Sequence, residues 1–259
     1  MNLEQILALA AMNLGEPLLA IAEDRASRLC RTEAAAGGGN TIAILPLQGA
    51  LRARGGMDIF RARLADAMAN PDVGAIVLDV DTPGGTVAGT METAEAVKAA
   101  SQVKPVTAMV DGMCASAGYW IASQASSIVA TPSAEVGSIG VLALHMEFSA
   151  AMQAAGVKAT IMRSTPYKAE GNMFEPLSDE AKAQIESEVS ASHADFVRAV
   201  AMGRRTSQAK VSSDFGQGRM VGAQKALDTG MIDRIGSMAD VLSGMRTKHS
   251  FRRRASFAL

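Results

Sequence analysis

The sequence predicts an α/β fold in which a largely parallel sheet is flanked by helices. Apolar runs typical of buried strands alternate along the chain with amphipathic segments typical of helices. One of these runs, AIVLDVD at residues 75–81, is apolar almost throughout, as expected of a strand covered on both faces. This alternation favours parallel strands joined by right-handed crossovers.

The expected elements follow one another in a regular order. The expected strands cover residues 41–47, 75–81, 106–111 and 127–132, a stretch around Val141, and residues 157–163. The expected helices cover residues 16–35, 58–70, 86–101, 116–124, 149–155, 178–206 and 222–230, with one more short helix after 237. Their ends carry the usual signals, because Pro71 stops one helix and Gly230 ends another. Acidic residues in the SDEA motif suit the first turn of the helix that opens at Ser178.

Composition divides the chain into three parts and excludes several classes of function. The AAAGGGN stretch marks a boundary, so we expect an N-terminal arm at 1–39, one domain at 40–236 and a basic tail at 237–259 that is disordered toward its end. A net charge of −1 gives no case for nucleic-acid binding. The two cysteines, Cys30 and Cys114, make neither a disulfide framework nor a metal site. We expect no cofactor, no signal peptide and no membrane span, and therefore a soluble protein.

Two short motifs carry the chemistry, and each follows a predicted strand. DTPGG at 81–85 offers free backbone N–H groups at Gly84 and Gly85. GMCASAGY at 112–119 places Ser116 among small residues, including Ala117 and Gly118, at an expected helix start. A nucleophile beside an oxyanion site is the minimum equipment for acyl transfer. The alternatives are an ordinary helix cap at the serine and a plain turn at the glycines.

The better candidate for the base that activates this serine is a lysine, and the alternative is a histidine in a Ser-His-Asp triad, whose geometry cannot be read from spacing. His145, His193 and His249 stand in no recognisable catalytic context. Lys168 follows a predicted strand and a Thr-Pro turn, and a lysine acts as a base when apolar burial keeps it neutral. Taken without context, a lysine is a solvated surface charge. Ser138, between two glycines, is either a turn residue or a helper that orients the lysine.

Together these motifs resemble the signal peptide peptidase A family of serine-lysine proteases. DTPGG, ASAGYW, EVGSIGV and the lysine of YKAEGNMFEPLSDE match that family in order and spacing, from about Thr41 to Gly236. The resemblance implies a crotonase- and Clp-protease-like fold with a repeated β-β-α core. It also implies that residues 40–236 form the protease domain, with Ser116 as nucleophile, Lys168 as base and Ser138 orienting the lysine.

The same resemblance implies the rest of the site and the biological setting. Gly85 and the N–H of Ala117 would form the oxyanion hole, and Gly84 and Gly118 would let the substrate approach. Within the family the chain is most similar to lambda-type prohead proteases, as the DTPGGTVAG and CASAG motifs indicate. We therefore expect a homo-oligomer that cleaves capsid scaffold, portal or itself inside the prohead, in the host cytoplasm. The alternatives are a bacterial peptidase that degrades short peptides and a crotonase-like module without protease activity.

Overall fold

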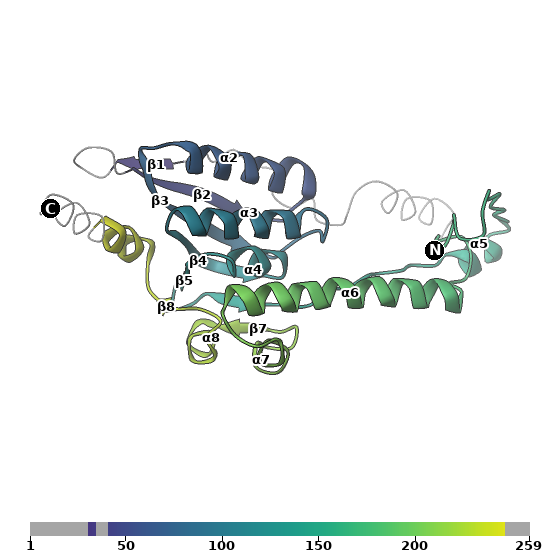
Figure 1. Cartoon of the computed structure of the whole chain (residues 1–259). Coiled ribbons are helices and arrows are strands. Elements are labelled where there is room, and N and C mark those ends of the chain that lie inside the picture. Colours follow the sequence, from purple (N-terminus) through teal and green to yellow (C-terminus); the bar gives the residue numbers. More distant parts are fainter. Residues whose placement is uncertain (1–30, 35–40, 247–259) are drawn as a thin grey trace, which may run out of the picture. The chain divides into compact units, whose positions relative to one another are not determined.

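The computed structural model describes residues 31–34 and 41–246, which are drawn in colour in Figure 1. The chain divides into two compact units. Of the described residues, the larger unit contains 31–34, 41–140 and 193–246, and the smaller contains 141–192. The expected helix at 16–30, the AAAGGGN break after Ala34 and the end of the tail lie outside the described residues.

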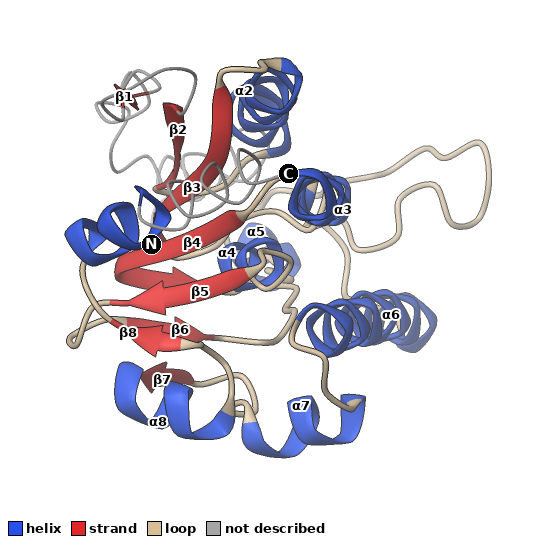
Figure 2. Ribbon diagram, turned by 60° about the vertical axis from the view of Figure 1, so that its left-hand side comes forward, coloured by secondary structure: helices blue, strands red, loops and turns tan. Residues whose placement is uncertain are grey.

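The larger unit is built on one sheet of eight strands, most of them parallel (Figure 2). Its main path, in spatial order, is β1 (Arg31–Ala34), β2 (Thr41–Gln48), β3 (Val73–Thr82), β4 (Val106–Ala115), β5 (Ser127–Ala130) and β8 (Arg234–Ile235). Two short strands branch from it: β6 (Glu135–Gly137) pairs in parallel with β4, and β7 (Met220–Gly222) pairs antiparallel with β6. The expected fold class is therefore confirmed. The helix expected to end at residue 35 is wrong over 31–34, because this segment pairs with the exposed edge of β2.

Helices cover both faces of this sheet. The main core lies between the sheet and α2 (Asp58–Ala69), α3 (Thr90–Val103), α4 (Ala117–Ala122) and the last part of α6 (Asp179–Gly203). On the other face, helical residues 238–246 pack Val241, Leu242 and Met245 against the first half of the central strands. A π-turn η1 (Ala53–Met57) precedes α2, and α7 (Gln208–Asp214) and α8 (Ala223–Thr229) complete the unit. Burial on both faces explains the continuous apolar runs in the sequence.

The smaller unit contains less regular structure than the sequence predicts. It consists of α5 (Ser149–Ala154), the first part of α6 and connecting loops. The strands expected around Val141 and at 157–163 are wrong, since no described strand pairs with either segment. An apolar run becomes a strand only where a neighbour takes up its backbone hydrogen bonds. Three of the apolar side chains involved are instead exposed: Leu142 by 86%, Leu144 by 76% and Met162 by 93%.

The short helix α4 is held by two buried aromatic side chains. The Trp120 ring stacks on Phe196 of α6, with ring centroids 4.6 Å apart and planes 11° from parallel. The hydroxyl of Tyr119 donates a hydrogen bond of 2.8 Å to the carbonyl of Met231. Helix α4 follows Ser116 directly, so these contacts also fix the end of β4 from which the serine extends.

Removing the Phe196 ring will strongly destabilise the larger unit. We expect Phe196→Ala to lower the free energy of unfolding by about 3–5 kcal/mol, because it leaves a cavity under Trp120 and removes the ring stacking. Urea denaturation followed by Trp120 fluorescence measures the change. Ile59→Ala on α2 is the control, since the Ile59 side chain is 46% exposed. A loss below 1 kcal/mol for Phe196→Ala would contradict this account of α4.

Candidate active site

The ends of three parallel strands bring the two sequence motifs together. Thr82 at the end of β3 pairs with Cys114 of β4, and Ala115 at the end of β4 pairs with Gly137 of β6. Parallel strands finish at the same edge of a sheet, and this edge is where α/β proteins place their sites. The glycine turn after β3 and the serine after β4 are therefore neighbours.

Ser116 adopts a strained backbone conformation between β4 and α4. Its φ is 51° and its ψ is −121°, a region that glycine occupies easily and other residues rarely adopt. The N–H of Ser116 donates to the carbonyl of Gly137 at 2.8 Å, and the N–H of Trp120 donates to the carbonyl of Ser116 at 3.0 Å. The side chain caps no N–H among the described residues, although it occupies the cap position of α4. This sharp strand-to-helix turn leaves the hydroxyl free, which argues against an ordinary cap.

The glycine pair after β3 lies too close to its neighbours to carry side chains. A Cβ atom on Gly84 would be 2.7 Å from the Cβ of Ser116 and 2.9 Å from the carbonyl oxygen of Ala115. A Cβ on Gly85 would be 1.8 Å from the carbonyl oxygen of Leu51. Leu51 bridges the turn, since its N–H donates to Gly84 at 2.8 Å and its carbonyl accepts from Thr86 at 2.9 Å. Three backbone segments therefore lie very close together here: the glycine turn, the segment at Leu51 and the turn at Ser116.

Two backbone donors at this edge remain available. Among the hydrogen bonds of the described residues, none takes up the N–H of Gly85 or that of Ala117. Gly84 differs, because its N–H donates to the Thr82 hydroxyl at 3.0 Å. Gly118 keeps the first turn of α4 tight, since a Cβ there would lie 2.3 Å from the Thr82 methyl group. Free amides next to a serine hydroxyl can bind the negative oxygen of a tetrahedral intermediate.

Ser138 also lies at this edge of the sheet. It follows β6 directly, as Ser116 follows β4, and the pair Ala115–Gly137 aligns the two strands immediately before these serines. Like Ser116, it has a positive φ, of 52°, and its N–H donates to the carbonyl of Arg219 at 3.0 Å. Ser116 and Ser138 therefore each follow the last paired residue of two adjacent parallel strands.

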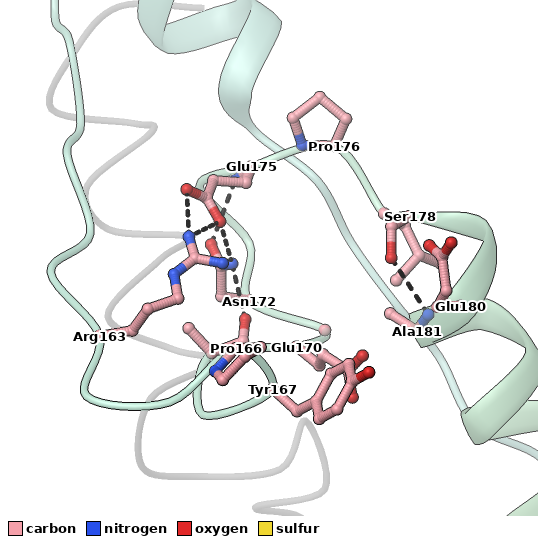
Figure 3. Close-up of a pocket in the computed structure, with 13 residues that line it drawn as sticks. Arg163, Pro166, Tyr167, Glu170, Asn172, Glu175, Pro176, Ser178, Glu180 and Ala181 are labelled. Atoms are coloured by element: carbon pink, nitrogen blue, oxygen red, sulfur yellow. Dashed lines mark hydrogen bonds and ion pairs between the residues drawn. The ribbon is translucent and has the colours of Figure 1, made fainter.

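Lys168 belongs to the smaller unit and lies on a turn. Its N–H donates to the carbonyl of Thr165 at 3.3 Å. Lys168 is exposed, so the apolar pocket expected from the sequence is not found around it. Nearby, Arg163 pairs with Glu175, and Asn172 binds the Glu175 carboxylate. Figure 3 shows these side chains around a cavity of about 290 Å³ lined by residues of the same unit. Lys168 therefore belongs to a different unit from Ser116 and Ser138.

His145 and Cys114 have defined surroundings, whereas the Nδ1 atom of His193 is buried without a hydrogen-bond partner among the described residues. A ring nitrogen of His145 lies 3.2 Å from the carbonyl of Asn172, and His249 lies outside the described residues. Cys114 is fully buried, and this burial raises the pKa of its thiol. Within residues 31–34 and 41–246, no group of three or more His, Cys, Asp or Glu side chains could hold a metal ion. No described helix combines the length and apolar character needed to cross a bilayer.

One residue at this edge was missed in the sequence. Thr82 lies within the DTPGG motif, of which only the glycines were expected to contribute to the site. Its hydroxyl bonds a backbone N–H two residues along the chain, as threonine commonly does at turns. The position of a threonine directly before Pro-Gly-Gly could have indicated this hydrogen bond to the turn.

A strained serine lies between strand and helix, at the same edge of a parallel sheet as two free backbone amides, on a Clp-protease-like fold, and this arrangement is typical of acyl-transfer sites. The model of peptidase family S49 matches residues 98–252, so the chain belongs to this family. A structure of the 1510-N membrane-bound stomatin-specific protease, a mutant form, shares the fold with a TM-score of 0.51 and 16% identity, covering 77% of this chain and 82% of the other.

Curated relatives come from a phage and from a bacterium. Capsid assembly protease C of Escherichia phage lambda is 34% identical over 217 residues, which are 80% of this chain and 49% of the relative. Protease 4 of Salmonella typhi is 31% identical over 212 residues, which are 79% of this chain and 34% of the relative. The chain therefore spans half or less of the length of these relatives.

Placing a side chain on Gly85 will destabilise the protein. We expect Gly85→Ala to lower the free energy of unfolding by about 2 kcal/mol, because its Cβ forces the backbone away from Leu51. Gly244→Ala is the control, since a Cβ on Gly244 meets no described atom within 4 Å and the residue lies in a helix. Alanine there should stabilise the protein slightly. Chemical denaturation compares the two, and equal effects would refute the close approach at Gly85.

Relieving the strain at position 116 will stabilise the fold. We expect Ser116→Gly to be more stable than Ser116→Ala by about 1–2 kcal/mol, because only glycine adopts this φ and ψ without cost. Both variants lose the hydroxyl, so their difference isolates the backbone term. Thermal unfolding by calorimetry measures it. A glycine variant that is no more stable than the alanine variant would show that the turn is unstrained.

Proposed function

We propose that this protein is a serine endopeptidase with a Ser116–Lys168 catalytic dyad. The observation that carries the proposal is the strained, uncapped serine beside the free N–H groups of Gly85 and Ala117. Strain of this kind concentrates at functional sites. Membership of peptidase family S49 supports peptide-bond hydrolysis as the reaction.

In the proposed mechanism the dyad forms and then hydrolyses an acyl-enzyme. Neutral Lys168 takes the Ser116 hydroxyl proton as Oγ attacks the scissile carbonyl carbon, and the carbonyl electrons move to oxygen. The N–H groups of Gly85 and Ala117 bind this oxyanion. When the intermediate collapses, the C–N bond breaks and Lys168 protonates the leaving amine. Lys168 then takes a proton from water, whose oxygen attacks the ester, and returns it to Oγ as the acid leaves.

The surroundings of the dyad complete the proposal. Ser138 accepts a hydrogen bond from protonated Lys168 and so orients its amine, while Gly84 and Gly118 leave room for an extended substrate backbone. Lysine acts as a base only when water is excluded from it. The exposed apolar side chains of the smaller unit support a homo-oligomer in which this unit is covered by other copies.

The similarity to the lambda capsid assembly protease supports a role in phage head maturation. The substrates would then be capsid scaffold, portal or the protein itself, inside the prohead and the host cytoplasm. The similarity to Protease 4 of Salmonella typhi supports the second candidate, a bacterial peptidase that degrades short peptides. Incubation with the products of neighbouring capsid genes, followed by mapping of the cleaved ends, separates the two roles. Cleavage of short peptides without any cleavage of these proteins favours the second.

Removing either member of the dyad will abolish proteolysis. We expect Ser116→Ala and Lys168→Ala each to lower kcat/KM by about 10³-fold or more without loss of folding, because the two residues act as a unit. Hydrolysis of fluorescein-labelled casein measures the effect. Lys182→Ala is the matched control, since Lys182 is an exposed lysine that pairs only loosely with Glu186, at 3.9 Å. A fully active Ser116→Ala enzyme would rule out the nucleophile, and a fully active Lys168→Ala enzyme would rule out the base.

A further inference from the structure

Thr82 contacts each of the backbone segments that make up the candidate site. Its side chain is fully buried at the end of β3. The hydroxyl donates to the carbonyl of Gly49 at 2.6 Å and accepts from the N–H of Gly84 at 3.0 Å. One oxygen therefore links the loop after β2 to the glycine turn after β3.

The methyl group of Thr82 makes the third contact. It lies against Gly118 so closely that a Cβ on Gly118 would be 2.3 Å from it. Gly118 is in the first turn of α4, next to the free N–H of Ala117 and two residues after Ser116. The two branches of a single side chain thus face the two halves of the oxyanion site, the hydroxyl toward one and the methyl toward the other.

The hydroxyl contacts explain why the glycine turn holds one conformation. Gly49 and Gly84 both have positive φ, of 67° and 99°, and neither has a side chain that could hold this conformation. The Leu51 N–H also bonds Gly84, at 2.8 Å, and together with the Thr82 hydroxyl it joins the same two loops. Without the hydroxyl, the buried Gly84 N–H loses its acceptor, and the turn must move to find another. Gly85 is the next residue and moves with it.

We propose that Thr82 is a positioning residue that holds the Gly85 N–H where the oxyanion forms. This inference rests on the proposed function of Ser116 and its neighbouring amides. An oxyanion donor acts mainly in the transition state, so its displacement lowers kcat more than it raises KM. A displacement of about 1 Å in such a group is enough to cost roughly 100-fold in rate.

The experiment compares three variants by steady-state kinetics on a quenched fluorogenic peptide selected for hydrolysis by the wild-type enzyme. Thr82→Val keeps the shape and the methyl group but loses the hydroxyl, and we expect kcat to fall by about 10–100-fold with KM within threefold. Thr82→Ser keeps the hydroxyl, and we expect it to retain kcat within about fivefold. Thr107→Val is the matched control, because Thr107 is a buried threonine of β4 whose hydroxyl bonds Ser127 at 3.0 Å.

Several outcomes would overturn the proposal. They are an unchanged kcat in a folded Thr82→Val enzyme, a rise in KM alone, a loss in Thr82→Ser equal to that in Thr82→Val, and an equal loss of kcat in Thr107→Val. If Thr82→Val fails to fold, Thr82→Ser still decides, because a large loss of kcat there shows that the hydroxyl is not what matters. Ser116→Ala in the same assay separates the two levels of inference. If Ser116→Ala stays active the proposed function fails, whereas a normal Thr82→Val beside an inactive Ser116→Ala removes only the role of Thr82.

Discussion

The close approach of three backbone segments at the end of the sheet is the constraint on which the candidate site depends. The glycine turn, the bridging residue Leu51 and the serine turn lie so near one another that side chains on Gly84 and Gly85 would overlap other atoms. This approach puts backbone rather than side chains next to Ser116, since a Cβ on Gly84 would be 2.7 Å from the Cβ of Ser116. Backbone donors are fixed by the fold and need no reorganisation during a reaction, which is the property that electrostatic stabilisation requires.

The rest of the larger unit can be understood as support for this edge. The parallel register brings β3, β4 and β6 to an end together, so the turns that follow them meet. The stacking of Trp120 on Phe196 and the hydrogen bond of Tyr119 hold α4 against the core. Strain at Ser116 persists only because such contacts determine the conformation on both sides of it. Stability elsewhere in the core thus maintains a local conformation that is unfavourable by itself.

Much of this arrangement could be predicted from the sequence, for identifiable reasons. The strands β2 to β5 are long or strongly apolar, and the glycine turn and Ser116 come directly after β3 and β4. The three-residue strand β6 could not be seen, because its sequence EVG is too short to show a pattern, and this strand is what places Ser138. The apolar runs around Val141 and at 157–163 had the opposite outcome, because they were predicted as strands and do not form any. They have the composition of strands, but strand formation depends on a neighbour that no local pattern reveals.

The burial of Cys114 determines how its thiol reacts with cysteine reagents. The thiol is two residues from the nucleophile in sequence, yet it is sealed within the core, and burial raises its pKa. Its reactive thiolate form is therefore scarce in the folded state. Alkylating agents and mild oxidants should therefore not react with Cys114. A lack of reaction would say nothing about whether the turn at Ser116 is intact. The thiol of this short motif is thus unreactive, while Ser116, two residues later, is only partly buried.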